Sequence, residues 1–189
     1  MSLRIIGGEM RGRPLKSPRS ALIRPTTGIL RKSVFDICKE QIVDAQFLDL
    51  FAGTGAMGIE ALSRGAAHAT FVDQDKEALL CIRENLKRLK LEERATILRG
   101  DALELLKRLE ERQKKYDLIY IDPPYYEKHF HPEILALLDH MDLARGATIF
   151  VEEGIPSPWE KEKIPLEHFA LKNSRRFGRS VLYQYRAVA

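Results

Sequence analysis

Cysteine and long apolar runs are both scarce in this chain. Only two cysteines, Cys38 and Cys81, occur among 189 residues, and they do not form a C-x-x-C pair. This excludes a disulfide scaffold and a cysteine zinc site, and it suits a reducing compartment. No apolar run approaches the ~18 residues of a membrane-spanning helix, and the N-terminus lacks a signal peptide's apolar core. We therefore expect a soluble, cytoplasmic protein that binds no membrane. The five histidines show no ligand spacing, so we expect no metal site.

Length and composition indicate one globular domain with a short extension. Hydrophobic residues make up 44% of the chain and charged residues 31%. These proportions are typical of a folded protein, and a chain of this length buries a sizeable core without disulfide bonds. We expect a basic N-terminal extension over residues 1–43, built from a hairpin and a helix, and an α/β domain over residues 44–189.

Positive charge is concentrated near the N-terminus. Residues 1–35 hold eight Lys or Arg and one acid, a net charge of +7, whereas the remainder carries −3. Clustered cations favour nucleic-acid binding because they release counterions from phosphates, although a solubilising surface has the same composition. A second basic stretch, residues 172–186, has five Lys or Arg and no acid. The expected phosphate contacts are Arg11, Arg13, Arg24 and Arg31.

From residue 46 onward, short apolar runs alternate with amphipathic segments. Such alternation predicts βαβ units and a mostly parallel sheet. The expected strands are 46–51, 69–73, 95–98, 116–122 and 147–152. The expected helices are 28–43, capped by Thr26 or Thr27, then 56–64, 76–90, 102–112 and 132–142. Two β-rich stretches, 166–173 and 180–187, predict a closing hairpin.

A glycine-rich segment follows the first predicted strand of the sheet. Gly53, Gly55 and Gly58 fit G-x-G-x-x-G between a strand and a helix, where glycine permits a tight turn close to a ligand. The second strand ends twenty positions after Gly53, at Asp73, whose carboxylate suits ribose hydroxyls. Asp49 precedes the loop and would repel a pyrophosphate, but it suits a cationic methionine group. The pattern therefore favours S-adenosylmethionine over a dinucleotide.

The fourth strand runs directly into Asp122-Pro123-Pro124-Tyr125. The two prolines stiffen this loop and cannot donate hydrogen bonds, so Asp122 and the Pro123 carbonyl form a pair of acceptors. Such a pair fits the two hydrogens of an exocyclic amine and holds its nitrogen in place for methyl transfer. Tyr125 offers a flat face on which an unstacked base can lie.

Several motifs together resemble the RsmD family of bacterial 16S ribosomal RNA guanine-N2 methyltransferases. They are Arg4-Ile5-Ile6-Gly7-Gly8, Arg11-Gly12-Arg13, Ile23-Arg24-Pro25-Thr26, Arg31-Lys32-Ser33-Val34-Phe35, the glycine loop, residues 58–66 and Asp122-Pro123-Pro124-Tyr125. The resemblance implies a class I, Rossmann-like methyltransferase fold with a mostly parallel seven-stranded sheet and a C-terminal antiparallel hairpin. Asp73 stands where many relatives would carry Glu, and Gly28 occupies a helix start where a more polar residue is expected.

The resemblance also implies the parts of the site. Asp73 would hold the ribose, Asp101 and Ala102 would border the adenine, and Asp122 with Tyr125 would handle the target base. The expected catalytic residues are Asp122, Pro123 and Tyr125. The expected cofactor site comprises Asp49, Phe51, Gly53, Gly55, Asp73, Gln74, Asp101 and Ala102.

The leading hypothesis is methylation of a guanine N2 amine in 16S ribosomal RNA, within a small-subunit particle, by a monomer. The same acceptor pair would serve adenine N6 in DNA or a glutamine amide of a protein, although 189 residues leave no room for a large recognition domain. A non-catalytic RNA-binding or assembly factor is a further alternative, against which the intact Asp122-Pro123-Pro124-Tyr125 loop argues. A nicotinamide oxidoreductase is disfavoured because no second domain is available.

Overall fold

The computed structural model describes residues 3–18, 26–123, 130–155 and 165–188. Within these residues the α-helices are α1 (Gly28–Ile37), α2 (Ala56–Ser63), α3 (Lys76–Leu89), α4 (Ala102–Glu111) and α5 (Phe130–Asp139). Two short 3-10 helices are η1 (Glu92–Arg94) and η2 (Asp142–Ala144). The strands are β1 (Gln46–Leu50), β2 (His68–Asp73), β3 (Ala95–Arg99), β4 (Leu118–Ile121), β5 (Thr148–Gly154), β6 (Phe169–Phe177) and β7 (Ser180–Ala187).

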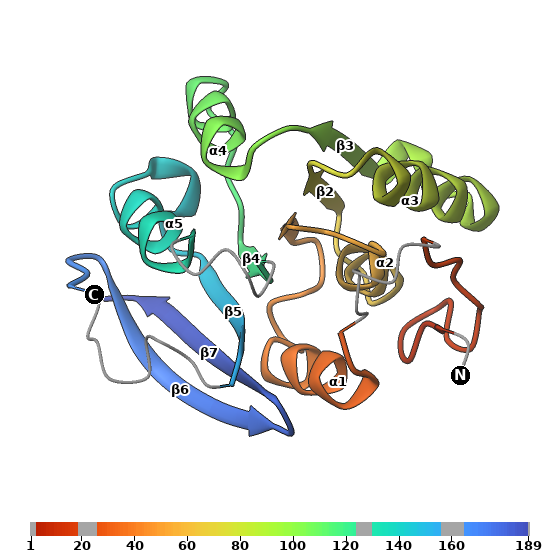
Figure 1. The fold of residues 1–189 in the computed structure, drawn as a ribbon, viewed down its shortest axis with the longest axis horizontal. Coiled ribbons are helices and arrows are strands. Elements are labelled where there is room, and N and C mark those ends of the chain that lie inside the picture. Colours follow the sequence, from red (N-terminus) through yellow and green to blue (C-terminus); the bar gives the residue numbers. More distant parts are fainter. Residues whose placement is uncertain (1–2, 19–25, 124–129, 156–164, 189) are drawn as a thin grey trace.

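The seven strands form one sheet in the order β3-β2-β1-β4-β5-β7-β6 (Figure 1). Strands β1 to β5 pair in parallel, and β7 runs antiparallel between β5 and β6. The first five strands therefore all end at one border of the sheet, here called the carboxyl edge, and all begin at the opposite border, the amino edge. The strand order reverses between β1 and β4, and such a switch point is where open α/β sheets bind ligands.

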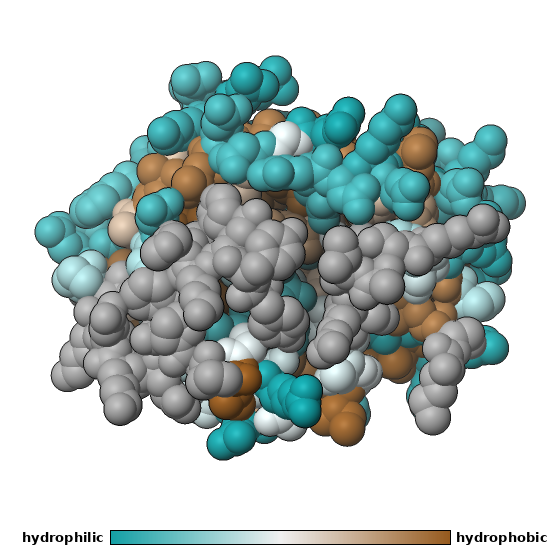
Figure 2. Space-filling model, in the orientation of Figure 1, coloured by the Kyte–Doolittle hydropathy of each residue, from teal (hydrophilic) through white to brown (hydrophobic). Residues whose placement is uncertain are grey.

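The sheet separates two apolar clusters. Successive side chains of a strand point to opposite faces, so Phe47 and Leu48 of β1 lie in different clusters. Phe47 stacks on Phe35 of α1, with 6.1 Å between the ring centroids, in the cluster that also includes residues of α2 and α3. Leu48 belongs to the cluster formed with α4 and α5. Hydrophilic side chains cover the outer surfaces of α3 and α4 (Figure 2), as their amphipathic spacing predicts.

Residues 3–18 form a folded-back segment that packs on α2 and α3. Ile5 and Leu15 are buried in the cluster of α1, α2 and α3. The segment turns at residues 8–13, here called the N-terminal turn, where the Met10 amide donates to Ser63 Oγ at 2.9 Å. Gly8 has a φ of +74°, and a Cβ there would lie 1.9 Å from the Ser63 carbonyl oxygen. Only glycine therefore allows the turn to lie this close to the end of α2.

The sequence-based prediction of an α/β fold with a mostly parallel seven-stranded sheet and a closing hairpin is confirmed. Several element boundaries differ from those expected: α1 ends at Ile37 rather than at residue 43, α5 covers Phe130–Asp139, β4 is confined to Leu118–Ile121, and β6 covers Phe169–Phe177. Helix α1 does begin at Gly28, because the Thr27 hydroxyl caps it by accepting from the Leu30 amide at 3.3 Å. Among the described residues, no helix has the length and apolar character needed to span a membrane.

Candidate functional site

The loop between β1 and α2 lies at the carboxyl edge and adopts backbone conformations that favour glycine. Gly53 and Gly55 have φ values of +51° and +72°. A Cβ on Gly55 would lie 2.7 Å from the Ile82 side chain. The Gly53 amide donates to Asp73 Oδ2 at 2.7 Å, so the acid that ends β2 holds the glycine loop directly. The two sequence signals for a nucleoside cofactor therefore meet in space.

Asp49 lies under this loop and is only 1% exposed. Its Oδ2 accepts from the Gly58 amide at 2.9 Å, in the first turn of α2. Burial raises the pKa of Asp49 to about 8, and the charge of Asp73 adds to the rise, whereas the Gly58 hydrogen bond opposes it. A cation that bound beside Asp49 would stabilise the charged form of this carboxyl group, and the ammonium of a methionine group is such a cation.

A second part of the site lies between β2 and α4. Asp101 caps α4, because its Oδ1 accepts from the Leu103 and Glu104 amides at 2.9 and 3.1 Å. Its Oδ2 accepts from Gln74 Nε2 at 3.2 Å, so the two residues lie together. Ala102 is buried at the start of α4. Asp73 Oδ1 accepts from the Asp75 amide, and burial raises the pKa of Asp73 despite its hydrogen bonds.

Asp122 follows β4 and lies beside the end of β1, where its amide donates to the Leu50 carbonyl at 3.4 Å. Burial raises the pKa of Asp122 well above its usual range. The charges of Glu152 and Asp49 raise it further, and a hydrogen bond from the Thr26 side chain lowers it. Pro123 is partly exposed. Tyr125 lies outside the described residues. Asp122 is therefore an acid held next to the glycine loop with an elevated affinity for a proton.

Two residues that were not expected in the site, Glu152 and Tyr120, support Asp122. Glu152, near the end of β5, is 5% exposed and accepts from the Tyr120 hydroxyl at 2.5 Å. Burial raises the pKa of Glu152, while its hydrogen bonds with Tyr120 and Ser180 lower it. The signal was present in the sequence, since an apolar strand that ends in an acid recurs at β5 as it does at β2 and β4.

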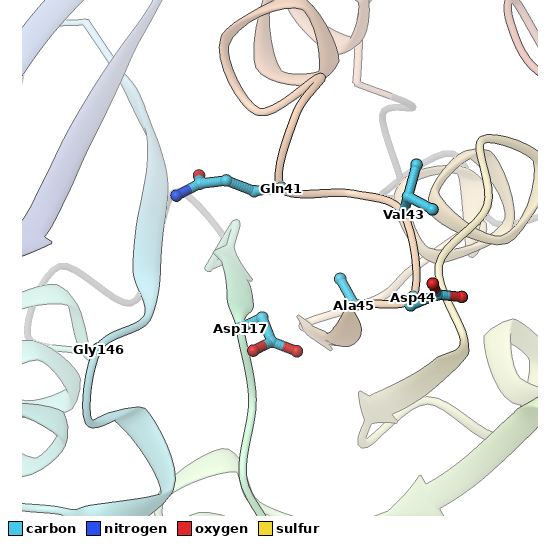
Figure 3. Close-up of a pocket in the computed structure, with 6 residues that line it drawn as sticks. All are labelled: Gln41, Val43, Asp44, Ala45, Asp117 and Gly146. Carbon is cyan, nitrogen blue, oxygen red and sulfur yellow. The ribbon is translucent and has the colours of Figure 1, made fainter.

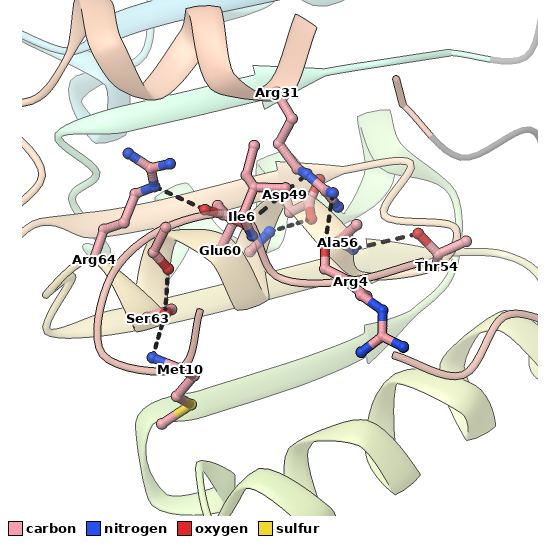
Figure 4. A network of polar contacts seen from close by, with 12 residues as sticks. Arg4, Ile6, Met10, Arg31, Asp49, Thr54, Ala56, Glu60, Ser63 and Arg64 are labelled. Carbon is pink, nitrogen blue, oxygen red and sulfur yellow. Dashed lines mark hydrogen bonds and ion pairs between the residues drawn. The ribbon is translucent and has the colours of Figure 1, made fainter. Parts of the chain in front are cut away.

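The arginines expected to bind phosphate lie in different environments. Arg11 and Arg13 are exposed on the N-terminal turn, beside the last residue of α2. Helix α2 runs from the carboxyl edge to the amino edge, so these two side chains lie far from Asp122. Arg31 is 2% exposed and pairs with Glu60 inside the fold (Figure 4), which differs from the surface position expected for it. Arg24 lies outside the described residues.

A different basic group reaches the carboxyl edge. Strand β6 exposes Arg175 and Arg176 beside the end of β5, and Arg179 is exposed in the turn that leads to β7, whereas Lys172 is exposed nearer the start of β6. Ser180, the first residue of β7, pairs with Gly154, the last residue of β5. Residues 169–187 are here called the C-terminal hairpin. Its tip therefore lies where β5 ends.

Two further features of the described residues lie away from this edge. A cavity of about 230 Å³ is lined by residues at the amino edge: Gln41, Val43, Asp44, Ala45, Asp117 and Gly146 (Figure 3). Near the end of α5, ligand atoms of Asp139, His140 and His168 lie within 4.8 Å of one another. The Asp139 carboxylate already accepts from three backbone amides, those of residues 167–169, which gives it a structural role.

Comparison with known proteins agrees with this arrangement. The family model described as "Conserved hypothetical protein 95" matches residues 3–186. Ribosomal RNA small subunit methyltransferase D of Escherichia coli strain K12 is 37% identical over 171 residues, which are 86% of this chain and 84% of that protein. The chain belongs to this family, the RsmD family. The resemblance inferred from the sequence motifs is therefore confirmed.

Solved structures show the same fold. That of yhhF from Escherichia coli superposes with a TM-score of 0.83 at 32% identity, covering 99% of this chain and 98% of the other. SMU.776, a methyltransferase solved as a complex with SAH (S-adenosylhomocysteine), has a TM-score of 0.66 at 15% identity and covers 83% of this chain and 49% of its own. The class I methyltransferase fold is confirmed, and the cofactor predicted for this fold agrees with the ligand of that neighbour.

Proposed function

We propose that this protein transfers a methyl group from S-adenosylmethionine to the exocyclic N2 amine of a guanine in 16S ribosomal RNA. One observation carries the proposal: Asp122, an acid with a raised pKa, lies against the end of β1, where Asp73 holds the glycine loop. The relatives named as ribosomal RNA small subunit methyltransferases support RNA as the substrate.

Different residues at the carboxyl edge would bind different parts of S-adenosylmethionine. Asp73, which already holds Gly53, would accept hydrogen bonds from the ribose, and Asp101 with Gln74 and Ala102 would border the adenine. Asp49 would face the methionine ammonium. S-adenosylmethionine supplies an activated methyl group on its sulfonium. These side chains would orient the cofactor so that this methyl group faces Asp122.

Asp122 would position the acceptor and receive its proton. The Asp122 carboxylate and the Pro123 carbonyl accept the two N–H groups of the guanine amine, which directs the nitrogen lone pair toward the methyl group. Transfer of the methyl group to this nitrogen would leave the positive charge on the nitrogen and the sulfur of the departing cofactor neutral. The raised pKa of Asp122 makes its carboxylate a competent acceptor for the proton that leaves. Thr26 and the charge of Glu152 would tune this affinity.

We also propose that basic side chains on two surfaces contact the RNA backbone. Arg11 and Arg13 lie on the N-terminal turn, and Arg24 precedes α1 in the sequence. The C-terminal hairpin presents Arg175, Arg176 and Arg179 close to the end of β5, and it exposes Lys172 nearer the start of β6. Phosphate contacts of this kind position an RNA strand without reading its sequence.

Transfer of labelled methyl from S-adenosylmethionine tests the proposal. The substrates are naked ribosomal RNA and small-subunit particles from cells that lack this protein, and the modified base is then mapped. Label on guanine N2 of 16S ribosomal RNA is the expected result, and comparison of the two substrates shows which one is used. Label on adenine N6 or on a protein glutamine would overturn the guanine assignment. Failure to bind S-adenosylmethionine in calorimetry would favour a binding protein without methyltransferase activity.

A further inference from the structure

Arg31 is a buried cation whose hydrogen-bonding groups are only partly used. Its side chain is 2% exposed, and Nη2 donates to the Arg4 carbonyl at 2.8 Å. Nε and Nη1 have no hydrogen-bond partner among the residues that the structure describes. Glu60 Oε2 lies 3.9 Å from Nε, which is close enough for an ion pair but too far for a hydrogen bond.

Glu60 has little capacity left for Arg31. Its Oε1 accepts from Arg64 Nε at 2.8 Å, and its Oε2 accepts from the Ile6 amide at 2.9 Å. One buried carboxylate therefore balances two guanidinium groups, and Arg31 is the more deeply buried of the two. A buried charge that is only partly compensated and has open N–H groups is costly, so the arrangement indicates an anion that completes it.

The surroundings of Arg31 place it near the proposed cofactor site. Tyr120 lies near enough to Arg31 to affect its pKa, and Tyr120 on β4 is the register partner of Asp49 on β1. Glu60 lies one helical turn beyond Ala56, the first residue of α2. Figure 4 shows the Arg31 side chain extending from α1 toward Asp49 and the start of α2. The amide groups at a helix N-terminus also favour an anion.

We propose that Arg31 binds the carboxylate of the methionine group of S-adenosylmethionine. This inference rests on the proposed function, from which it takes its cofactor. The amino-acid end of that molecule is a zwitterion. Asp49 supplies the negative partner for its ammonium, and Nη1 of Arg31, which has no hydrogen-bond partner among the described residues, supplies a charge-assisted hydrogen bond for its carboxylate.

Decarboxylated S-adenosylmethionine tests this assignment, because it lacks only the carboxylate. Calorimetry should show that the wild-type protein binds S-adenosylmethionine roughly 10- to 100-fold more tightly than the decarboxylated compound. In Arg31→Gln the affinity for S-adenosylmethionine should fall by about this factor, while that for the decarboxylated compound should change by less than about threefold. The preference for the carboxylate would then disappear.

Arg64→Gln is the matched control, since Arg64 shares Glu60 but its guanidinium is bonded to Glu60 and lies beside Gly7. This variant should keep the wild-type preference. Arg31→Lys keeps the buried charge but has fewer, differently placed donors, so it should lower the preference for S-adenosylmethionine over the decarboxylated compound roughly 3- to 10-fold. This variant replaces Arg31→Gln in the test if Arg31→Gln does not fold.

The outcomes separate this inference from the proposed function. Equal losses for both ligands in a folded Arg31 variant, or an unchanged preference, would overturn the role of Arg31 and leave the methyltransferase proposal intact. Absence of any binding by the wild-type protein would overturn both. Absence of RNA methylation with normal cofactor binding would overturn only the proposed function, because this experiment contains no RNA.

Discussion

The two edges of the sheet carry similar residues in different environments. At the carboxyl edge, Asp49 and Glu152 are 1% and 5% exposed, and burial raises the pKa of both. At the amino edge, Asp117 is exposed and accepts from the Gln46 amide at 2.7 Å, which fixes the start of β1. An acidic side chain therefore fixes the backbone at the amino edge, whereas buried acidic side chains at the carboxyl edge form a site with raised pKa values.

The basic residues show a parallel difference. Several cations near the N-terminus are used within the fold: Arg4 donates to the Gly12 carbonyl, Lys16 pairs with Glu84, and Arg31 is buried. The C-terminal hairpin instead exposes Arg175, Arg176 and Arg179 near the carboxyl edge, and Arg175 reaches Ser33 of α1 at 3.5 Å. The clustering of basic residues along the sequence therefore does not show which basic surface lies nearest the site. The directions of the strands show it, because they place the tip of the hairpin at the carboxyl edge.

The largest expected effect compares the two ends of β4. Asp122→Ala should lower methyl transfer roughly 10²- to 10⁴-fold, because it removes the carboxylate proposed to hold the amine and to take its proton. Binding of S-adenosylmethionine should change by less than about threefold, since the proposed role of Asp122 is to contact the target base rather than the cofactor. Asp117→Ala, before the opposite end of the same strand, should retain transfer. Single-turnover assays and calorimetry measure the two quantities. Equal activity of the two variants would remove the distinction between the edges.

The second prediction compares the two basic surfaces. Changing Arg175, Arg176 and Arg179 together to Gln should weaken RNA binding roughly 10- to 30-fold near 0.1 M salt and lower the salt slope by about two to three. Changing Arg11 and Arg13 to Gln should have a smaller effect, below about fivefold, because these residues lie at the other edge. Filter binding across a salt series gives both slopes. A larger loss in the Arg11 and Arg13 variant would show that the RNA path follows the N-terminal turn.

The third prediction concerns how the stability of the ligand-free protein depends on pH. Asp49 has a pKa of about 8 in the folded protein against an ordinary value of 3.8, so the folded state binds the extra proton between these values. The free energy of unfolding should therefore fall as pH rises from about 4 to 8, by at most about 1.4 kcal/mol per pH unit from this group. Asp49→Asn should make the fall shallower, while Asp117→Asn should keep the wild-type slope. Urea unfolding at pH 5, 6, 7 and 8 measures this, and identical slopes in the wild type and Asp49→Asn would contradict it.

Much of the fold was predictable because it depends on local patterns. Apolar runs of four to six residues marked β1, β2 and β4, and the amphipathic spacing marked α3 and α4. The glycine loop, Asp73 and Asp122 were predictable for the same reason, since each lies at the end of a strand or directly after it. The start of α5 and the length of β6 were not, because helix ends and hairpin strands depend on packing against their neighbours.

Residue order was enough to infer the alternation of strands and helices, the family, and the acids that meet at the carboxyl edge, because all of these follow from short-range patterns along the chain. Three features become clear only in the folded molecule: Arg31 is buried beside Glu60, Tyr120 reaches Glu152, and particular basic residues share an edge with Asp122. Those placements depend on contacts between segments up to 142 positions apart, such as Arg175 with Ser33, and no local pattern records which side chains such contacts will cover.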